Sequence, residues 1–122
     1  MEYKILSDKI LLPSLRDVLR IHFYIKFMQN KVEFFDSDLD IIIELYLAGG
    51  YSSTDEQNRF IRLCINKKYK KSVQSVRNSF SRYVNSGVLK KPKNRELYVS
   101  EEYLPTIEFD KIILNHVISH AN

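Results

Sequence analysis

Charge is separated along this chain, and the separation restricts which surfaces its fold can present. The segment from Gln57 to Arg95 contains twelve Lys and Arg and no Asp or Glu. The segment before it, from Asp36 to Glu56, contains six acidic residues and no basic one. The whole chain has 19 basic and 15 acidic residues, so the part outside 57–95 has 7 basic against 15 acidic, a balance of −8. A surface of one sign and this size most often contacts a polyanion.

Composition indicates one globular domain in this chain of 122 residues, of which 44% are hydrophobic. No apolar run approaches the roughly 20 residues that a membrane-spanning helix needs. The first residues lack the basic start and the small-residue cleavage site of a secretory signal. Because the chain has one cysteine, an internal disulfide is excluded, and we expect a cytoplasmic protein without membrane contact.

Apolar spacing predicts a central domain flanked by two helices. We expect an N-terminal arm and apolar helix at 1–31, a central domain at 32–104 and a C-terminal amphipathic helix at 105–122. His22 lies on the first apolar helix, where a core or interface histidine is expected. Cys64 follows the inner face of a central helix and is expected to be a small buried side chain.

Start and stop signals divide the central domain. The expected elements, in chain order, are a short strand at 31–35, helices at 36–48, 54–68 and 72–86, and a hairpin at 88–100. Asp36 or Ser37 is expected to cap the first of these helices. Gly49 and Gly87 are expected to end the first and third helices, because glycine readily adopts the left-handed conformation that closes a helix.

The helix expected at 72–86 has an apolar face and a polar face without acids. On a wheel of roughly 100° per residue, Val76 and Phe80 fall within about 60° of Val73, which predicts the inner face. The far side carries amide, hydroxyl and basic side chains, the types that contact bases and phosphates. Arg77 falls on the flank, where we expect it to pair with an acid of a neighbouring helix or to reach a phosphate.

The order of elements resembles the winged helix-turn-helix family over about residues 32–100. The resemblance is carried by "SVQSVRNSFSRYVNSGVLKK", where a helix meets "GVL" at the start of a wing, and by "DLDIIIELYLAGG", which is similar to the family's first helix. In that family the third helix enters the major groove and the wing contacts the backbone or minor groove. The resemblance implies a mainly α fold with a small β-hairpin, in which the N- and C-terminal helices flank a winged core.

Carried over by position, the resemblance assigns DNA contacts to the third helix and the wing. The recognition-helix candidates are Gln74, Ser75, Asn78 and Arg82, to which the polar face adds Lys71. The wing candidates are Lys90, Lys91, Lys93 and Arg95. Asn78 and Arg82 are expected to read bases, and the wing residues are expected to hold phosphates. Neither group is expected to contribute to the core.

These features predict a non-enzymatic protein that binds duplex DNA, as a small regulator or a replication accessory factor. The apolar helices at 14–30 and 108–120 predict a homodimer or a docked protein partner. The alternative is an assembly protein that uses the same scaffold for protein–protein contacts, since one fold serves several functions. The bias toward Ile, Lys, Asn and Tyr is similar to that of small bacteriophage-encoded proteins, so the alternative includes a virion component.

No catalytic site, metal or cofactor is expected. The acidic run "DSDLD" begins like a calcium loop, but Ile41 and Leu47 stand where that loop needs Gly and Glu. His116 and His120 have the spacing of two metal ligands, whereas a structural zinc site needs four. With three glycines in the chain, a Gly-rich phosphate loop is not found.

Overall fold

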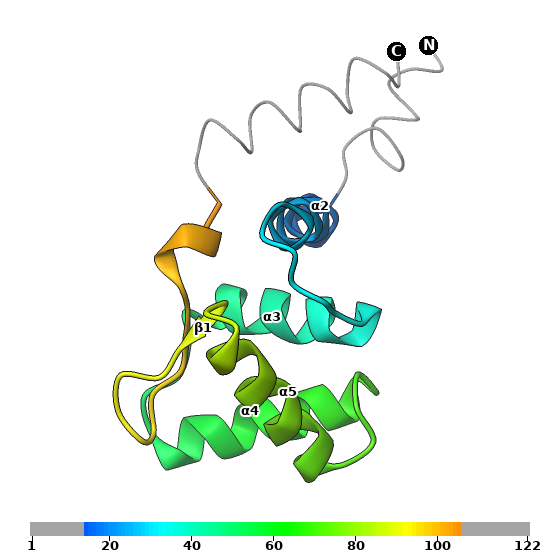
Figure 1. The fold of residues 1–122 in the computed structure, drawn as a ribbon. Coiled ribbons are helices and arrows are strands. Elements are labelled where there is room, and N and C mark those ends of the chain that lie inside the picture. Colours follow the sequence, from blue (N-terminus) through cyan, green and yellow to red (C-terminus); the bar gives the residue numbers. More distant parts are fainter. Residues whose placement is uncertain (1–13, 106–122) are drawn as a thin grey trace.

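The computed structural model describes residues 14–105, which are mainly helical with a small two-stranded antiparallel sheet (Figure 1). In chain order the elements are α2 (Leu15–Gln29), α3 (Asp36–Ala48), α4 (Thr54–Asn66), α5 (Val73–Asn85), β1 (Leu89–Lys90), β2 (Tyr98–Val99) and the 3₁₀ helix η2 (Glu101–Tyr103). Among these residues no helix is both long and apolar enough to cross a bilayer. The N-terminal arm expected before the first apolar helix and the helix expected at 108–120 lie outside the described residues.

Local capping groups set the helix boundaries. The Ser14 hydroxyl accepts a hydrogen bond from the Asp17 N–H at 3.2 Å, so α2 begins where the sequence predicts. Ser53 and Ser72 cap α4 and α5 with the same kind of bond. Gly49, with φ of +76°, ends α3 as predicted. The cap of α3 differs from the prediction, because the helix already begins at Asp36.

The segment 31–35 does not form the expected strand. Lys31 has φ of +57°, and the Val32 N–H donates to the Phe27 carbonyl at 2.9 Å, which closes the end of α2. Val32 and Phe34 then pack against the core. The apolar alternation in this segment therefore reflects a short connection between two packed helices, and the strand prediction is wrong.

The hairpin is shorter than predicted and is tied to the rest of the domain. Leu89 pairs with Val99, and beyond this register Tyr51 and Leu97 exchange two backbone hydrogen bonds of 3.0 and 2.9 Å. The connection between α3 and α4 thereby adds a short extended segment that is hydrogen-bonded to the hairpin. A β-carbon on Gly50 would lie 2.5 Å from the Leu97 carbonyl oxygen, so this approach requires glycine.

The core lies on both sides of α3, which runs between α2 and the α4–α5 pair (Figure 1). Phe27 of α2 stacks on Tyr83 of α5 with ring centroids 5.9 Å apart. The His22 ring is buried, and its Nε2 donates to the Tyr103 carbonyl at 2.8 Å, so the prediction of a core histidine is confirmed. Cys64 is buried as predicted, and burial raises the pKa of its thiol to about 12.

A buried carboxylate, that of Asp38, joins the start of α3 to α5. Burial by itself would raise the pKa of this carboxyl, but hydrogen bonds outweigh burial, and the pKa lies below its ordinary value. Its partners are Tyr83 Oη (2.5 Å), Ser79 Oγ (2.9 Å), Lys70 Nζ (3.0 Å), Arg82 Nη1 (3.1 Å) and the Phe35 N–H (3.3 Å). Three separate parts of the chain thus converge on one negative charge.

Substituting this carboxylate should destabilise the fold. We expect Asp38→Asn to lower the free energy of unfolding by about 3 kcal/mol, because breaking a buried ion pair leaves its partners uncompensated. Urea denaturation followed by circular dichroism measures the change.

The matched control is Asp40→Asn, whose pair with Arg20 keeps both side chains about one-third exposed and should contribute less than about 1 kcal/mol. The folded pKa of Asp38 is depressed, so its contribution is lost as the pH falls through that pKa. The stability gap between the parent and Asp38→Asn should therefore narrow in acid. A gap that stays constant from neutral to strongly acid pH would contradict the assignment.

Candidate nucleic-acid interface

Three of the twelve basic residues in 57–95 are used inside the fold. Lys67 pairs with Glu44 at 3.0 Å, and Lys70 and Arg82 pair with Asp38. The other nine are exposed and have no ion pair with an acid within 14–105. They are Arg59, Arg62, Lys68, Lys71, Arg77, Lys90, Lys91, Lys93 and Arg95.

Two acidic residues of α3, Asp40 and Glu44, also pair with arginines of α2. Arg16 pairs with Glu44, and Arg20 pairs with Asp40. Burial would raise the pKa of Glu44, but Lys67 and Arg16 together hold it below its ordinary value. The acids of α3 therefore do not neutralise the nine exposed bases, whose field remains on the surface of α4, α5 and the hairpin.

The inner face of α5 is rotated from the predicted one. Val76 and Phe80 are buried as expected, but Val73 is 45% exposed and Ser79 is buried. At roughly 100° per residue, the centre of the buried face lies about 50° away from the centre of the face predicted from Val73, Val76 and Phe80. The physical reason is the Ser79 hydroxyl, which donates to Asp38 and so faces α3.

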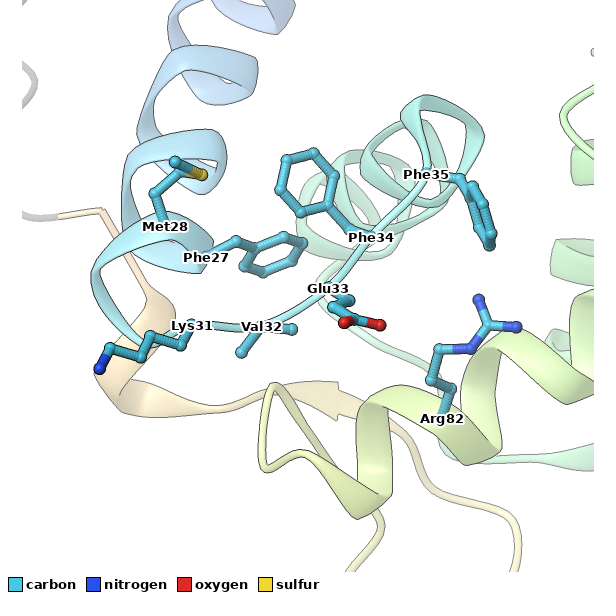
Figure 2. A pocket seen from close by; sticks show the side chains of 8 residues that line it. All are labelled: Phe27, Met28, Lys31, Val32, Glu33, Phe34, Phe35 and Arg82. Atoms are coloured by element: carbon cyan, nitrogen blue, oxygen red, sulfur yellow. The ribbon is translucent and has the colours of Figure 1, made fainter.

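This rotation turns Arg82 toward the fold. Its guanidinium pairs with Asp38 and lies 5.5 Å from the Phe35 ring centroid. Figure 2 shows the side chain rising from α5 toward that ring, at the edge of an apolar hollow that Phe27 and Phe34 also line. Arg82 lies outside the hydrophobic core, as expected, and its side chain is 46% exposed, but its pair with the buried Asp38 gives it a structural role that the sequence analysis did not predict.

The same rotation places Arg77 at a polar groove. Arg77 is exposed and pairs with no acid of the described part of the chain, so the first of its two expected roles is absent there. It lines a groove of about 460 Å³ between α5, the start of α4 and the hairpin. The polar lining of this groove is Tyr51, Gln57, Gln74, Arg77, Ser81, Asn85 and Lys91, and no acidic residue contributes to it.

The groove brings together two of the nine predicted site residues, Gln74 and Lys91. Asn78 joins them at the edge, because its Oδ1 accepts a hydrogen bond from Gln74 Nε2 at 2.8 Å. Ser75 is half-buried, and its N–H donates to the capping Ser72, so it serves the start of α5. The remaining basic candidates outside the lining are exposed: Lys71, Lys90, Lys93 and Arg95.

Five polar groove residues are not among the nine candidates: Tyr51, Gln57, Arg77, Ser81 and Asn85. Arg77, Ser81 and Asn85 follow Gln74 at intervals of three, seven and eleven residues, which is one face of a helix. That spacing is visible in the sequence and could have identified them. Gln57 comes from α4, and no local signal connects it to the face of another helix.

Comparisons with protein-family models, with curated proteins and with solved structures found no match. The function of the chain is therefore inferred from the charge, chemistry and geometry of the described residues.

The two arginines of α5 should differ in their effect on stability. We expect Arg82→Ala to lower the free energy of unfolding by about 1–2 kcal/mol. It removes a hydrogen bond to a charged group, while solvent screens its exposed part. We expect Arg77→Ala to change it by less than about 0.5 kcal/mol, since that side chain has no acidic partner within 14–105. Urea denaturation of both variants checks this, and equal stabilities would contradict the assignment.

Proposed function

We propose that this chain binds duplex DNA through α5 and the β1–β2 hairpin, in a winged helix-turn-helix arrangement. The observation that carries the proposal is an acid-free groove that Arg77 and Lys91 line, together with seven further exposed basic side chains in 59–95 that have no acidic partner in the described residues. Clustered Lys and Arg bind a polyanion by displacing its counterions. Amide and hydroxyl groups lie among these basic side chains and can form hydrogen bonds with base edges. A surface that is only solvated has no need of them.

The arrangement of elements supports the same proposal. Helices α4 and α5 follow one another with a turn between them, and the hairpin comes directly after α5. The backbone bonds between Tyr51 and Leu97 hold the hairpin beside the groove. In this arrangement α5 enters the major groove, and Lys90, Lys91 and Lys93 contact phosphates beside it.

Binding should depend steeply on salt. Each neutralised phosphate lowers the logarithm of the binding constant by about 0.9 per log unit of salt, so four to six contacts give a slope of about −4 to −5. We expect Lys91→Gln to weaken binding to all duplexes alike and to reduce the slope by about one unit. Fluorescence anisotropy on a random-sequence duplex over a salt series measures both quantities.

Lys31→Gln is the control for this experiment, because it removes an equal charge just after α2, where the side chain points away from Arg82 of α5 (Figure 2). It should leave the slope unchanged. A flat salt response of the parent protein, or no binding at low salt, would overturn the DNA proposal.

A protein partner is the second candidate, and the outer face of α2 favours it. Ile21, Tyr24 and Met28 follow one another at helical spacing and are 38%, 48% and 59% exposed. Exposed apolar side chains grouped in this way are typical of interaction surfaces. We propose that a second copy of the chain covers this face, and an assembly role, virion component included, would use the same surface.

Self-association should be sensitive to this face. We expect the parent protein to sediment as a dimer at tens of micromolar, the rough range of a modest interface. Burying one Ile side chain stabilises by about 1.5–3 kcal/mol, so Ile21→Lys should weaken the dimer by about 10- to 100-fold. Leu63→Lys is the matched control, because Leu63 on α4 is 37% exposed. A parent protein that is monomeric in analytical ultracentrifugation would exclude self-association and leave a different protein as the partner.

A further inference from the structure

We propose that the groove reads an A·T-rich stretch containing one specified G·C pair. Arg77, and not Arg82, is the residue that specifies that guanine. This inference rests on the proposed binding of duplex DNA, and it names which sequences the same surface prefers.

The amide content of the face favours adenine. Gln57, Gln74 and Asn85 line the groove, and the hydrogen bond from Gln74 holds Asn78 at its edge. Asn and Gln side chains make paired hydrogen bonds to N6 and N7 of adenine in the major groove. No carboxylate lines the groove, so the side-chain type that pairs with the cytosine amino group in direct readout is absent from it.

The exposed Val73 adds a contact that also favours A·T pairs. It lies in the first turn of α5, where recognition helices present side chains to base edges, and it is 45% exposed. Its isopropyl group stands beside Arg77 in a shallow hollow between α4 and α5. Apolar side chains at such positions contact the C5-methyl group of thymine, which only A·T pairs present.

The guanine contact is limited to one arginine within the groove. Arg77 is the only arginine in the lining of the groove, and an arginine fork binds O6 and N7 of guanine in a paired contact. Arg82 lies on the opposite flank of the helix, and its guanidinium is held by Asp38 at 3.1 Å. Moving Arg82 to a base would remove a partner from a fully buried charge, so it does not compete for this role.

The reading face is short. From Gln74 to Asn85 the helix rises by about 1.5 Å per residue, or about 16 Å in all. This length matches about five base pairs at 3.4 Å each. We therefore expect one copy of the chain to specify about five consecutive pairs, with the hairpin contacting phosphates beside them.

The test is selection of bound sequences from a random duplex library, followed by competition measurements. For the parent protein we expect a motif of about five pairs that is A·T-rich and contains one G·C pair. Arg77→Lys keeps the charge but lacks the fork, so it should lose the preference at that pair by about 5- to 150-fold. Its affinity for random duplex should stay within about twofold, and its A·T preference should remain.

Arg82→Lys is the matched control, because Lys can still pair with Asp38 and the inference gives Arg82 no base to read. It should select the same motif as the parent, and urea denaturation confirms that both variants are folded. No binding of the parent to any duplex overturns the proposed function itself. Binding without sequence preference, a G·C-rich motif, or an unchanged motif for Arg77→Lys overturns this inference alone. Loss of the guanine in Arg82→Lys instead of Arg77→Lys also overturns it.

Discussion

The orientation of α5 depends on one buried negative charge, that of Asp38. A carboxylate without access to water is stable only when donors surround it, and α5 supplies three of the five in this structure. Ser79, Arg82 and Tyr83 must therefore face α3 together, which fixes the rotation of the helix. The opposite face, from Gln74 to Asn85, is then necessarily the outer one. A stability constraint thus determines which side chains α5 can offer to a ligand.

The acidic and basic residues that are separated along the sequence also have different roles in the fold. Three acids of α3 form ion pairs with its neighbours. Glu44 pairs with Arg16 on α2 and with Lys67 at the end of α4, Asp40 pairs with Arg20 on α2, and Asp38 pairs with Lys70 and Arg82. Ion pairs within the described residues therefore involve only three of the twelve basic residues in 57–95. The other nine basic residues form no ion pair within the described residues, and two of them, Arg77 and Lys91, line the groove.

Features that depend on neighbouring residues could be predicted from the sequence, whereas features that depend on tertiary contacts could not. Helix limits at Ser14, Ser53 and Ser72 were predictable, because a capping side chain bonds to the backbone two or three residues away. The face of α5 was not, because Ser79 is turned inward by a carboxylate 41 residues earlier, which no helical wheel contains. A wheel weighs apolarity alone, so it placed the exposed Val73 inside and Arg82 among the readers. The helices and the hairpin were thus predictable, whereas the site depended on a single long-range contact.

The two proposed surfaces lie on opposite sides of α3, so they do not compete. The apolar face belongs to α2, and the groove belongs to α4, α5 and the hairpin (Figure 1). A two-fold dimer through α2 would present two copies of α5, and such dimers bind half-sites related by the same symmetry. One short reading face discriminates weakly among many competing sites, while two faces joined in one dimer square that discrimination. Duplex binding and self-association would then be parts of one function, since the dimer supplies the specificity that a reading face of about five base pairs lacks.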